Sequence, residues 1–438
     1  MAMATSSCSS PWVAPFLSTA TCNNGIKFRS LWKCNDKRSL FNLIVCKSSS
    51  EHHHNHPFAN GSPLHDALDA CGVDTHHARA ARKGFLKQID GLSVIEKETS
   101  IAINRPVDLG RAALQIAAED DALISHSSVP LPVDSFVERL DDLSMDFFAH
   151  HLPLTRPPPD AFIQSLERYF YVHKGFRRTS MNHRDVRDLY LHSVLTRRTG
   201  SLVMIAVIYS EMVKMLRLYG VVDFDIEIYF PHDLVSLPQG YDKQKSKVSD
   251  EPHIMTPLSL LVEMLRDLKD AFWPFQYGRN CSLFLRAASA TNFVTGSSII
   301  DGIASASNDN ASGFEVASMR AAQHRLGRGV WTGPRFGDIR RALAACERLV
   351  LLDFDIRELR DYSILLYHAG FFEESLHYLK LYENSKSSTQ TKKFSSDLNW
   401  ALEEDAERKL VIRLKLISME KGWSKPSTQS LWGTSEPW

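Results

Sequence analysis

The sequence predicts a mostly helical α+β fold followed by a short helical repeat unit. Three observations lead to this prediction. Residues 202–218 are the most hydrophobic stretch of the chain, and their first turns are apolar on every side, which is typical of an enclosed helix. Residues 223–230 then alternate polar and apolar, as a half-buried strand does. Gly337 and Gly370 open two similar helical segments that lie 33 residues apart.

Composition excludes several classes of protein. The 438 residues contain 51 basic and 51 acidic side chains, so no global charge attracts nucleic acid, and no nucleic-acid partner is expected. The longest apolar run, 202–208, is far shorter than the roughly 20 residues of a spanning helix, so no transmembrane segment is expected. Phosphate-binding glycine loops and zinc-ligand spacings are absent from the sequence, so we predict no cofactor and no metal site.

The first fifty residues predict a transit peptide. They hold ten serines and six basic residues but one acid, Asp36, and no compact apolar segment of the secretory type. We therefore expect import into the chloroplast stroma, with peripheral contact on a plastid membrane left open; mitochondrial import or a disordered tail without an address are the alternatives. Removing residues 1–50 leaves 45 basic and 50 acidic residues, a net charge of −5. Residues 51–104 are interpreted as a flexible linker and N-terminal segment.

Residues 105–295 are predicted to form the first folded domain. Apolar positions three and four apart indicate helices from about 108, around Phe136–Leu143, over 160–172 and over 258–268. Ser201 is placed to cap the enclosed helix, and Gly220 lies just past its end. Residues 239–257 are charged and contain Gly and Pro, so we expect a surface loop or insertion there.

The C-terminal part is predicted to be a helical repeat unit over residues 334–424, after a linker at 296–333 and before a disordered tail at 425–438. Ala342 and Ser375 each follow their glycine by five residues, where a small side chain lets paired helices approach closely. This layout is typical of the tetratricopeptide repeat, which has a period of 34 residues. One full unit and a preceding half are fewer than a free-standing array needs, so the unit should dock on the rest of the chain.

Three stretches together resemble the SirB-type transglutaminase-like proteins with C-terminal tetratricopeptide repeats, here in a plant plastid form. The stretches are 112–120, the segment 175–211 with its Arg197-Arg198-Thr199-Gly200 sequence, and the repeat 337–382. The resemblance covers roughly residues 105–385 and is poor between 236 and 330. It implies a degenerate transglutaminase-like (papain-like) core, in which a central buried helix packs on a small antiparallel sheet.

The resemblance also implies where a catalytic triad would lie. Catalytic relatives carry a nucleophilic cysteine two residues after the glycine, and this chain has Leu202 there. His232 matches the histidine position, although the preceding glycine of the family is missing, and Asp270 is the nearest counterpart of the aspartate. A base without a group to activate performs no acyl transfer. We therefore predict no catalytic residues.

The predicted function is binding. We expect a non-catalytic plastid protein that holds a protein partner through the repeat unit and the degenerate cleft, supporting assembly or stability of a plastid complex. The expected partner-binding residues are Leu359, Tyr362 and Leu366 on the repeat, with Arg197 and Arg198 beside the central helix.

Two other interpretations stay open at this point. One is a cysteine- or serine-type acyl hydrolase using Cys281 or Ser201 with His232. The other is an all-helical scaffold without any sheet. In addition, Cys71, Cys281 and Cys346 are expected to be buried small hydrophobes, and Arg340, Arg341, Glu347 and Arg348 to be ordinary surface charge.

Overall fold

The computed structural model describes most of the chain from residue 62 onward. The described residues are 62–92, 108–125, 129–152, 157–179, 185–224, 226–231, 235–242, 256–275, 281–290, 332–333, 337–389 and 398–423. The predicted transit peptide, His232 and the predicted tail at 425–438 lie outside them. Most described residues are helical, and the described strands form small two-stranded sheets, so the predicted α+β class is confirmed.

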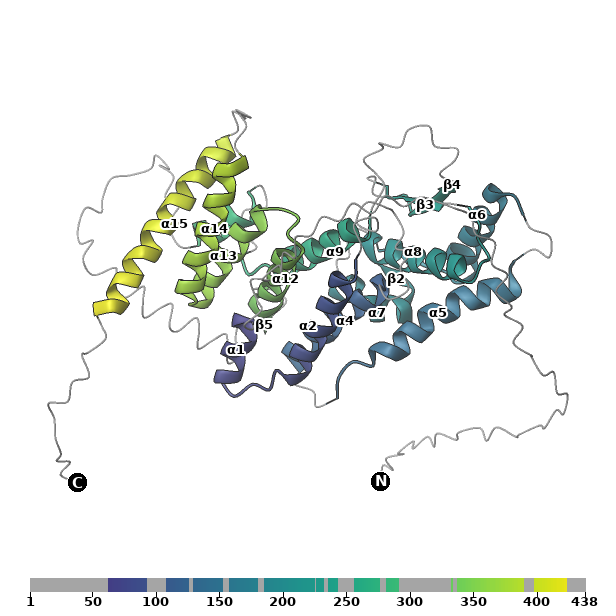
Figure 1. The fold of residues 1–438 in the computed structure, drawn as a ribbon, viewed down its shortest axis with the longest axis horizontal. Coiled ribbons are helices and arrows are strands. Elements are labelled where there is room, and N and C mark those ends of the chain that lie inside the picture. Colours follow the sequence, from purple (N-terminus) through teal and green to yellow (C-terminus); the bar gives the residue numbers. More distant parts are fainter. Residues whose placement is uncertain are drawn as a thin grey trace, which may run out of the picture. The chain divides into compact units, whose positions relative to one another are not determined.

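Two N-terminal helices lie within residues 51–104, the expected flexible linker and N-terminal segment. They are α1 (Pro63–Ala70) and α2 (His76–Asp90). Ser62 caps α1, and α2 packs along α4 (Leu109–Ser125) (Figure 1). Leu64, Leu68 and Phe85 are buried with the core of the molecule. Leu64 and Leu68 are four residues apart, which is a helical spacing, but polar residues surround them in the sequence and obscure the pattern.

The central helix α8 (Leu202–Leu218) is enclosed, as its sequence predicted. All but a few of its residues are buried, and α4, α5 (Val133–His150), α7 (Leu191–Arg197) and α9 (Pro257–Phe272) pack around it. Ser201 caps α8, because its Oγ accepts a hydrogen bond from the backbone N–H of Met204. The predicted cap is therefore confirmed.

A small antiparallel sheet follows the central helix. Strand β3 (Ile226–Tyr229) pairs with β4 (Gln239–Asp242), in a register that places Ile226 opposite Asp242 and Tyr229 opposite Gln239. Figure 1 shows this pair beside α6 (Pro159–Glu167) and α8. Residues 239–242 are thus a strand rather than the start of a surface loop. The all-helical alternative is wrong.

Short elements connect α6 to the central helix. The chain continues from α6 into a π-helical turn, Arg168–His173, and then into β1 (Arg177–Arg178). β1 pairs in parallel with β2 (Thr199–Gly200), directly before α8, and a 3₁₀ turn, Val186–Leu189, precedes α7. These short strands fix the chain at the first turn of α8.

The remaining helices continue from α9 toward the C-terminus. They are α10 (Leu283–Ser289), α12 (Ile339–Leu352), α13 (Arg357–Ala369), α14 (Phe372–Thr389) and α15 (Leu398–Trp423), and the short pair β5 (Thr332–Gly333) and β6 (Gly337–Asp338) precedes α12. α12 packs on α9 and on α13 (Figure 1). α10 packs on α13 and α15. The C-terminal helices therefore share their core with the helices around α8.

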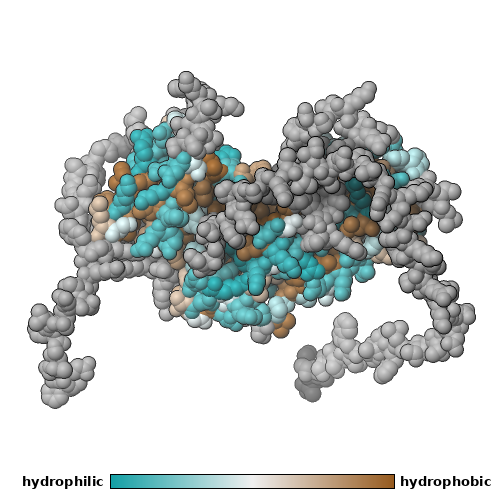
Figure 2. Space-filling model, viewed as in Figure 1, coloured by the Kyte–Doolittle hydropathy of each residue, from teal (hydrophilic) through white to brown (hydrophobic). Residues whose placement is uncertain are grey.

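Two serines join α13 to α14. The Ser363 hydroxyl donates to the Ser375 carbonyl at 2.8 Å, and the Ser375 hydroxyl donates to the Ser363 carbonyl at 2.8 Å. Both serines are fully buried, so a larger side chain at either position would separate the helices. On the face drawn in Figure 2, hydrophobic residues gather over these C-terminal helices at the left.

Candidate functional site

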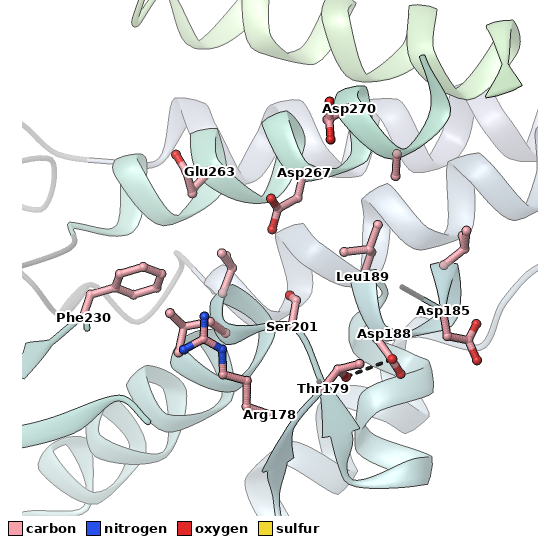
Figure 3. A pocket seen from close by; sticks show the side chains of 14 residues that line it. Arg178, Thr179, Asp185, Asp188, Leu189, Ser201, Phe230, Glu263, Asp267 and Asp270 are labelled. Carbon is pink, nitrogen blue, oxygen red and sulfur yellow. Dashed lines mark hydrogen bonds between the residues drawn. The ribbon is translucent and has the colours of Figure 1, made fainter. Parts of the chain in front are cut away.

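A pocket of about 320 Å³ lies at the N-terminal end of the central helix. Its walls come from four parts of the chain: the segment around β1 and the 3₁₀ turn, the first turn of α8, one side of α9, and Phe230 directly after β3 (Figure 3). The lining residues are Arg178, Thr179, Asp185, Val186, Asp188, Leu189, Ser201, Leu202, Val203, Phe230, Glu263, Asp267, Asp270 and Ala271.

The first turn of α8 forms one wall. Ser201 and Leu202 line the pocket, and the Ser201 backbone N–H donates to the Asp188 carbonyl at 2.9 Å. The Ser201 hydroxyl oxygen is engaged in the cap of α8. Gly200 must be glycine, because a Cβ there would lie 2.5 Å from a methyl of Val194. The chain is therefore packed tightly where a catalytic relative carries its nucleophile.

Hydrogen bonds fix the 3₁₀-turn wall. Asp188 is buried and accepts from the Thr179 hydroxyl at 2.9 Å and from the Arg197 guanidinium at 3.1 Å. Arg197 also contacts Asp185 at 3.1 Å, and Arg187 contacts the same carboxylate at 2.8 Å. Hydrogen bonds from Arg187, together with the nearby charge of Arg197, lower the pKa of Asp185 to about 2. Both aspartates of this wall are thus paired with arginines.

The α9 wall is acidic. Glu263, Asp267 and Asp270 lie along one side of the helix, and Figure 3 shows Asp267 projecting toward the Ser201 side of the pocket. Arg178 is the cation among the described lining residues, and it also donates to the Ser236 carbonyl at 3.1 Å. The pocket lining thus combines five carboxylates and one guanidinium with apolar side chains such as Leu202 and Phe230. That combination favours a ligand that has both positive charge and apolar surface.

The structure brings together two of the three positions that correspond to the triad. Leu202 and Asp270 line the same pocket, from α8 and α9. The third position, His232, lies outside the described residues. None of the described lining residues is a cysteine or a histidine.

The predicted basic pair lies beside the pocket. Arg197 ends α7 and reaches the aspartates of the 3₁₀ turn. Arg198 has a left-handed backbone (φ 59°), and its guanidinium donates to the Lys174 carbonyl at 2.9 Å. Both residues are exposed. Arg197 is therefore a support of the pocket wall, whereas Arg198 helps to close the turn that leads into β2.

The structure corrects the predicted partner surface on the C-terminal helices. Tyr362 is 0% exposed and Leu366 is 1% exposed, so neither side chain is available to a partner. The Tyr362 hydroxyl donates to Glu347 at 2.9 Å inside the core. Leu359 is half-buried against the same core. These residues face inward because α13 is covered on several sides, by α10, α12 and α14.

Two of the three cysteines among the described residues differ from expectation. Cys71 and Cys281 are exposed, whereas Cys346 is buried, and burial raises the pKa of its thiol well above the usual value. Cys281 precedes α10 and does not line the pocket. The candidate cysteine nucleophile is therefore separate from the cleft.

A buried ionic cluster was missed in the sequence. Arg348 is fully buried and contacts Glu119 at 3.1 Å and Asp120 at 2.6 Å, and Arg82 contacts Glu119 at 2.6 Å and Glu347 at 2.9 Å. Burial opposes the charge of Glu119, but Arg348 and Arg82 outweigh it and hold its pKa well below the usual range. The expectation of surface charge on α12 was wrong, because this helix packs against α4 and α1, and Arg82 of α2 reaches its Glu347.

The described residues contain no group of three or more histidine, cysteine, aspartate or glutamate side chains placed to hold a metal ion. Among them, no helix combines the length and the apolar character that crossing a bilayer requires.

Comparison with known proteins gives one match. Residues 134–224 match the family model described as Transglutaminase-like superfamily. A search of curated proteins and a search of solved structures each found no match. The matched range is about a fifth of the chain and extends from α5 through α8, so it includes the Ser201 and 3₁₀-turn walls of the pocket but not α9.

Proposed function

Because residues 134–224 form a transglutaminase-like domain, we propose that the chain is a non-catalytic binding protein whose cleft at the start of α8 holds a segment of a protein partner. The observation that carries the proposal is Leu202, which lines the cleft where a catalytic relative would present its nucleophile. An alkyl side chain cannot attack an acyl carbon. The cleft can still bind a ligand through its shape and the charge of its lining.

The charge of the cleft defines its occupant. Five carboxylates and one guanidinium, that of Arg178, line the cleft, so its lining carries a net negative charge. Leu202 and Phe230 add apolar surface to the same lining. A peptide segment with a basic side chain next to an apolar one matches both features, and its binding should weaken with salt.

The test is binding of fluorescent peptides, followed by polarisation. A peptide with a Lys or Arg beside an apolar residue should bind, and its acidic counterpart should not. Asp267→Asn with Asp270→Asn should weaken binding about thirtyfold, because each lost charge contributes on the order of 1 kcal/mol at a partly screened site. Equal binding of both peptides, or no effect of the double variant, contradicts the proposal.

A matched control removes the same charge elsewhere. Glu138→Gln with Asp142→Asn takes two carboxylates from the exposed side of α5, outside the pocket lining. This variant should bind the basic peptide like the unchanged chain. If it weakens binding as much as the α9 pair does, the effect is one of net charge and not of the cleft.

A serine-type acyl hydrolase is the second candidate, because Ser201 lines the pocket. Its hydroxyl oxygen already accepts the cap hydrogen bond of α8, and no described lining residue is a histidine base. We expect no labelling by a fluorophosphonate probe. Labelling that disappears in Ser201→Ala would establish a serine nucleophile and end the non-catalytic proposal.

The C-terminal helices offer a second partner surface in this proposal. A groove between α13, α14 and α15 is lined by Arg357, Lys386 and half-exposed Trp400, and it replaces the buried Tyr362 and Leu366 as the candidate contact. The setting we propose is a plastid complex. Affinity purification from chloroplasts should recover a stoichiometric partner that Trp400→Ala loses, and a fluorescent fusion of residues 1–50 should enter plastids.

A further inference from the structure

Helix α15 has apolar side chains on two opposite sides. Its inner side packs on α14 and α10 through Ala406, Leu410, Leu414 and Ile417, which are all buried. Its outer side carries Ile412, Leu416 and Met419, which are 59%, 56% and 63% exposed. At 3.6 residues per turn these three side chains fall within roughly 60° of arc, so they form one continuous stripe.

Basic residues border this stripe. Arg408 and Lys415 are exposed on one side of it, and Lys409 follows the other side, where it pairs with Asp405 at 2.7 Å. Residues 408–423 hold five basic residues and one acidic residue in a chain of zero net charge.

The acidic residues of α15 are concentrated in its first half, and two of them form ion pairs with neighbouring helices. Glu403 and Glu407 are engaged by Arg360, and Glu407 also by Lys386. Arg408 and Lys415 therefore present their charge to solvent, whereas Glu403 and Glu407 are paired with α13 and α14.

We propose that the second half of α15 lies in the plane of an anionic membrane surface, with the Ile412–Leu416–Met419 stripe inserted at the headgroup boundary. Exposed apolar residues flanked by Lys and Arg are the pattern of an interfacial helix. The basic borders complement anionic headgroups, and each such charge strengthens the contact severalfold near the surface. Three side chains are too small a patch for a stable dimer, which buries on the order of 800 Å² on each partner. The charge and the size of the stripe together favour lipid over a second copy.

The test is flotation of the full chain with vesicles of phosphatidylcholine, with and without phosphatidylglycerol. The chain should float with the anionic vesicles at low salt and lose binding as salt rises. Ile412→Ser with Leu416→Ser and Met419→Ser should reduce the partition coefficient about tenfold or more. Arg408→Gln with Lys415→Gln should reduce it severalfold at low salt and not at high salt.

Two controls separate this surface from the rest of the chain. Met145→Ser with Phe148→Ser alters exposed apolar side chains of α5, which are 42% and 44% exposed, and should leave flotation unchanged. All variants keep residues 1–61, so the basic N-terminal segment contributes equally to each. If the triple serine variant loses helical circular dichroism, the Arg408 and Lys415 pair decides, because those side chains are already in solvent.

Three outcomes overturn the proposal. The first is equal flotation with neutral and anionic vesicles. The second is unchanged flotation of both α15 variants. The third is a dimer of the unchanged chain that the triple variant converts to a monomer without any effect on vesicles, since the stripe would then be an interface between two copies.

Discussion

Single residues decide the chemistry of the cleft and the charge balance of the core. Leu202 removes the nucleophile, and Ser201 uses its hydroxyl to cap a helix. Deeper in the same helix, Glu211 is 3% exposed and accepts from the Leu109 backbone N–H at 3.0 Å and from Lys214 at 3.3 Å. Burial raises the pKa of Glu211 to about 7, and Lys214 only partly offsets this. A carboxyl on the central helix therefore titrates near neutral pH.

Glu211 should make stability fall as pH rises toward 7. Its folded pKa is above the ordinary value of 4.5, so its stabilising contribution is complete below 4.5 and is lost as pH rises through about 7. Glu211→Gln should remove this part of the slope, changing the difference in unfolding free energy between pH 5 and 8 by roughly 1–3 kcal/mol. Urea unfolding of both chains at several pH values measures it. Parallel pH curves for the two chains would show that Glu211 does not titrate in this window.

Arg348 should be among the most costly residues to replace. Arg348→Met keeps much of the volume but leaves Glu119 and Asp120 buried with less compensation, and the expected loss is about 3–5 kcal/mol. Arg357→Met is the matched control, because Arg357 is 67% exposed and pairs with Asp355 at the surface, so its loss should stay below about 1 kcal/mol. Urea midpoints of the two variants give the comparison. Similar losses would mean that the buried cluster contributes no more than a surface pair.

At the scale of elements, close approaches of the backbone set how α12 begins. Gly337 has a φ of 75°, and a Cβ there would lie 2.4 Å from the Trp273 carbonyl oxygen and 2.7 Å from that of Phe272. The start of α12 is thereby pressed against the end of α9. Asp338 then caps α12 by accepting from the backbone N–H groups of Arg340 and Arg341.

Gly337→Ala should therefore destabilise more than a glycine substitution in open space. Gly72 is the control, since its φ is 81° but a Cβ there meets nothing within 4 Å. Gly72→Ala should cost about 1 kcal/mol for the left-handed backbone alone. Gly337→Ala should cost about 2 kcal/mol more, because the overlap is with backbone atoms that cannot rotate away. Thermal melts of both variants test this, and equal melting temperatures would refute the packing argument.

At the scale of the whole molecule, charge pairs link segments that are far apart in sequence. Arg82 of α2 contacts Glu119 of α4 and Glu347 of α12, and Lys269 of α9 contacts Glu358 and Asp361 of α13. The contacts to Glu347, Glu358 and Asp361 join the C-terminal helices to α2 and α9, and the contact to Glu119 joins α2 to α4. Removing one partner leaves a buried charge in another segment. Separating any one segment therefore destabilises the segments it was paired with.

Residues 62–423 should consequently unfold in one transition. Calorimetry of the full chain should show a single peak, and Arg82→Met should move that peak as a whole because it weakens contacts in α4 and α12 together. Two separated peaks, or a shift of only one component, would mean that the C-terminal helices unfold on their own.

The sequence was informative where one segment carries its own pattern. The enclosed helix, the strand after it and the Ser201 cap follow from local periodicity and are confirmed. The buried cluster could not be predicted, since Glu119 and Arg348 are 229 residues apart and each looks like surface charge on its own helix. The prediction that Tyr362 and Leu366 contact a partner was wrong for a related reason: the repeat pattern does not show which helices cover α13. For the cleft, α8 was foreseen, but the acidic wall of α9 required the tertiary structure.

Because Cys346 is buried, the rate at which its thiol is modified can report how often the structure around it opens. A thiol-modifying reagent can reach Cys71 and Cys281 at once, whereas Cys346 on α12 must wait until the helices around it open. In a chain whose other six cysteines are replaced by serine, the slow labelling of Cys346 would measure the rate of those openings. The rate would report, without denaturant and under native conditions, how often the C-terminal helices separate from the helices around α8.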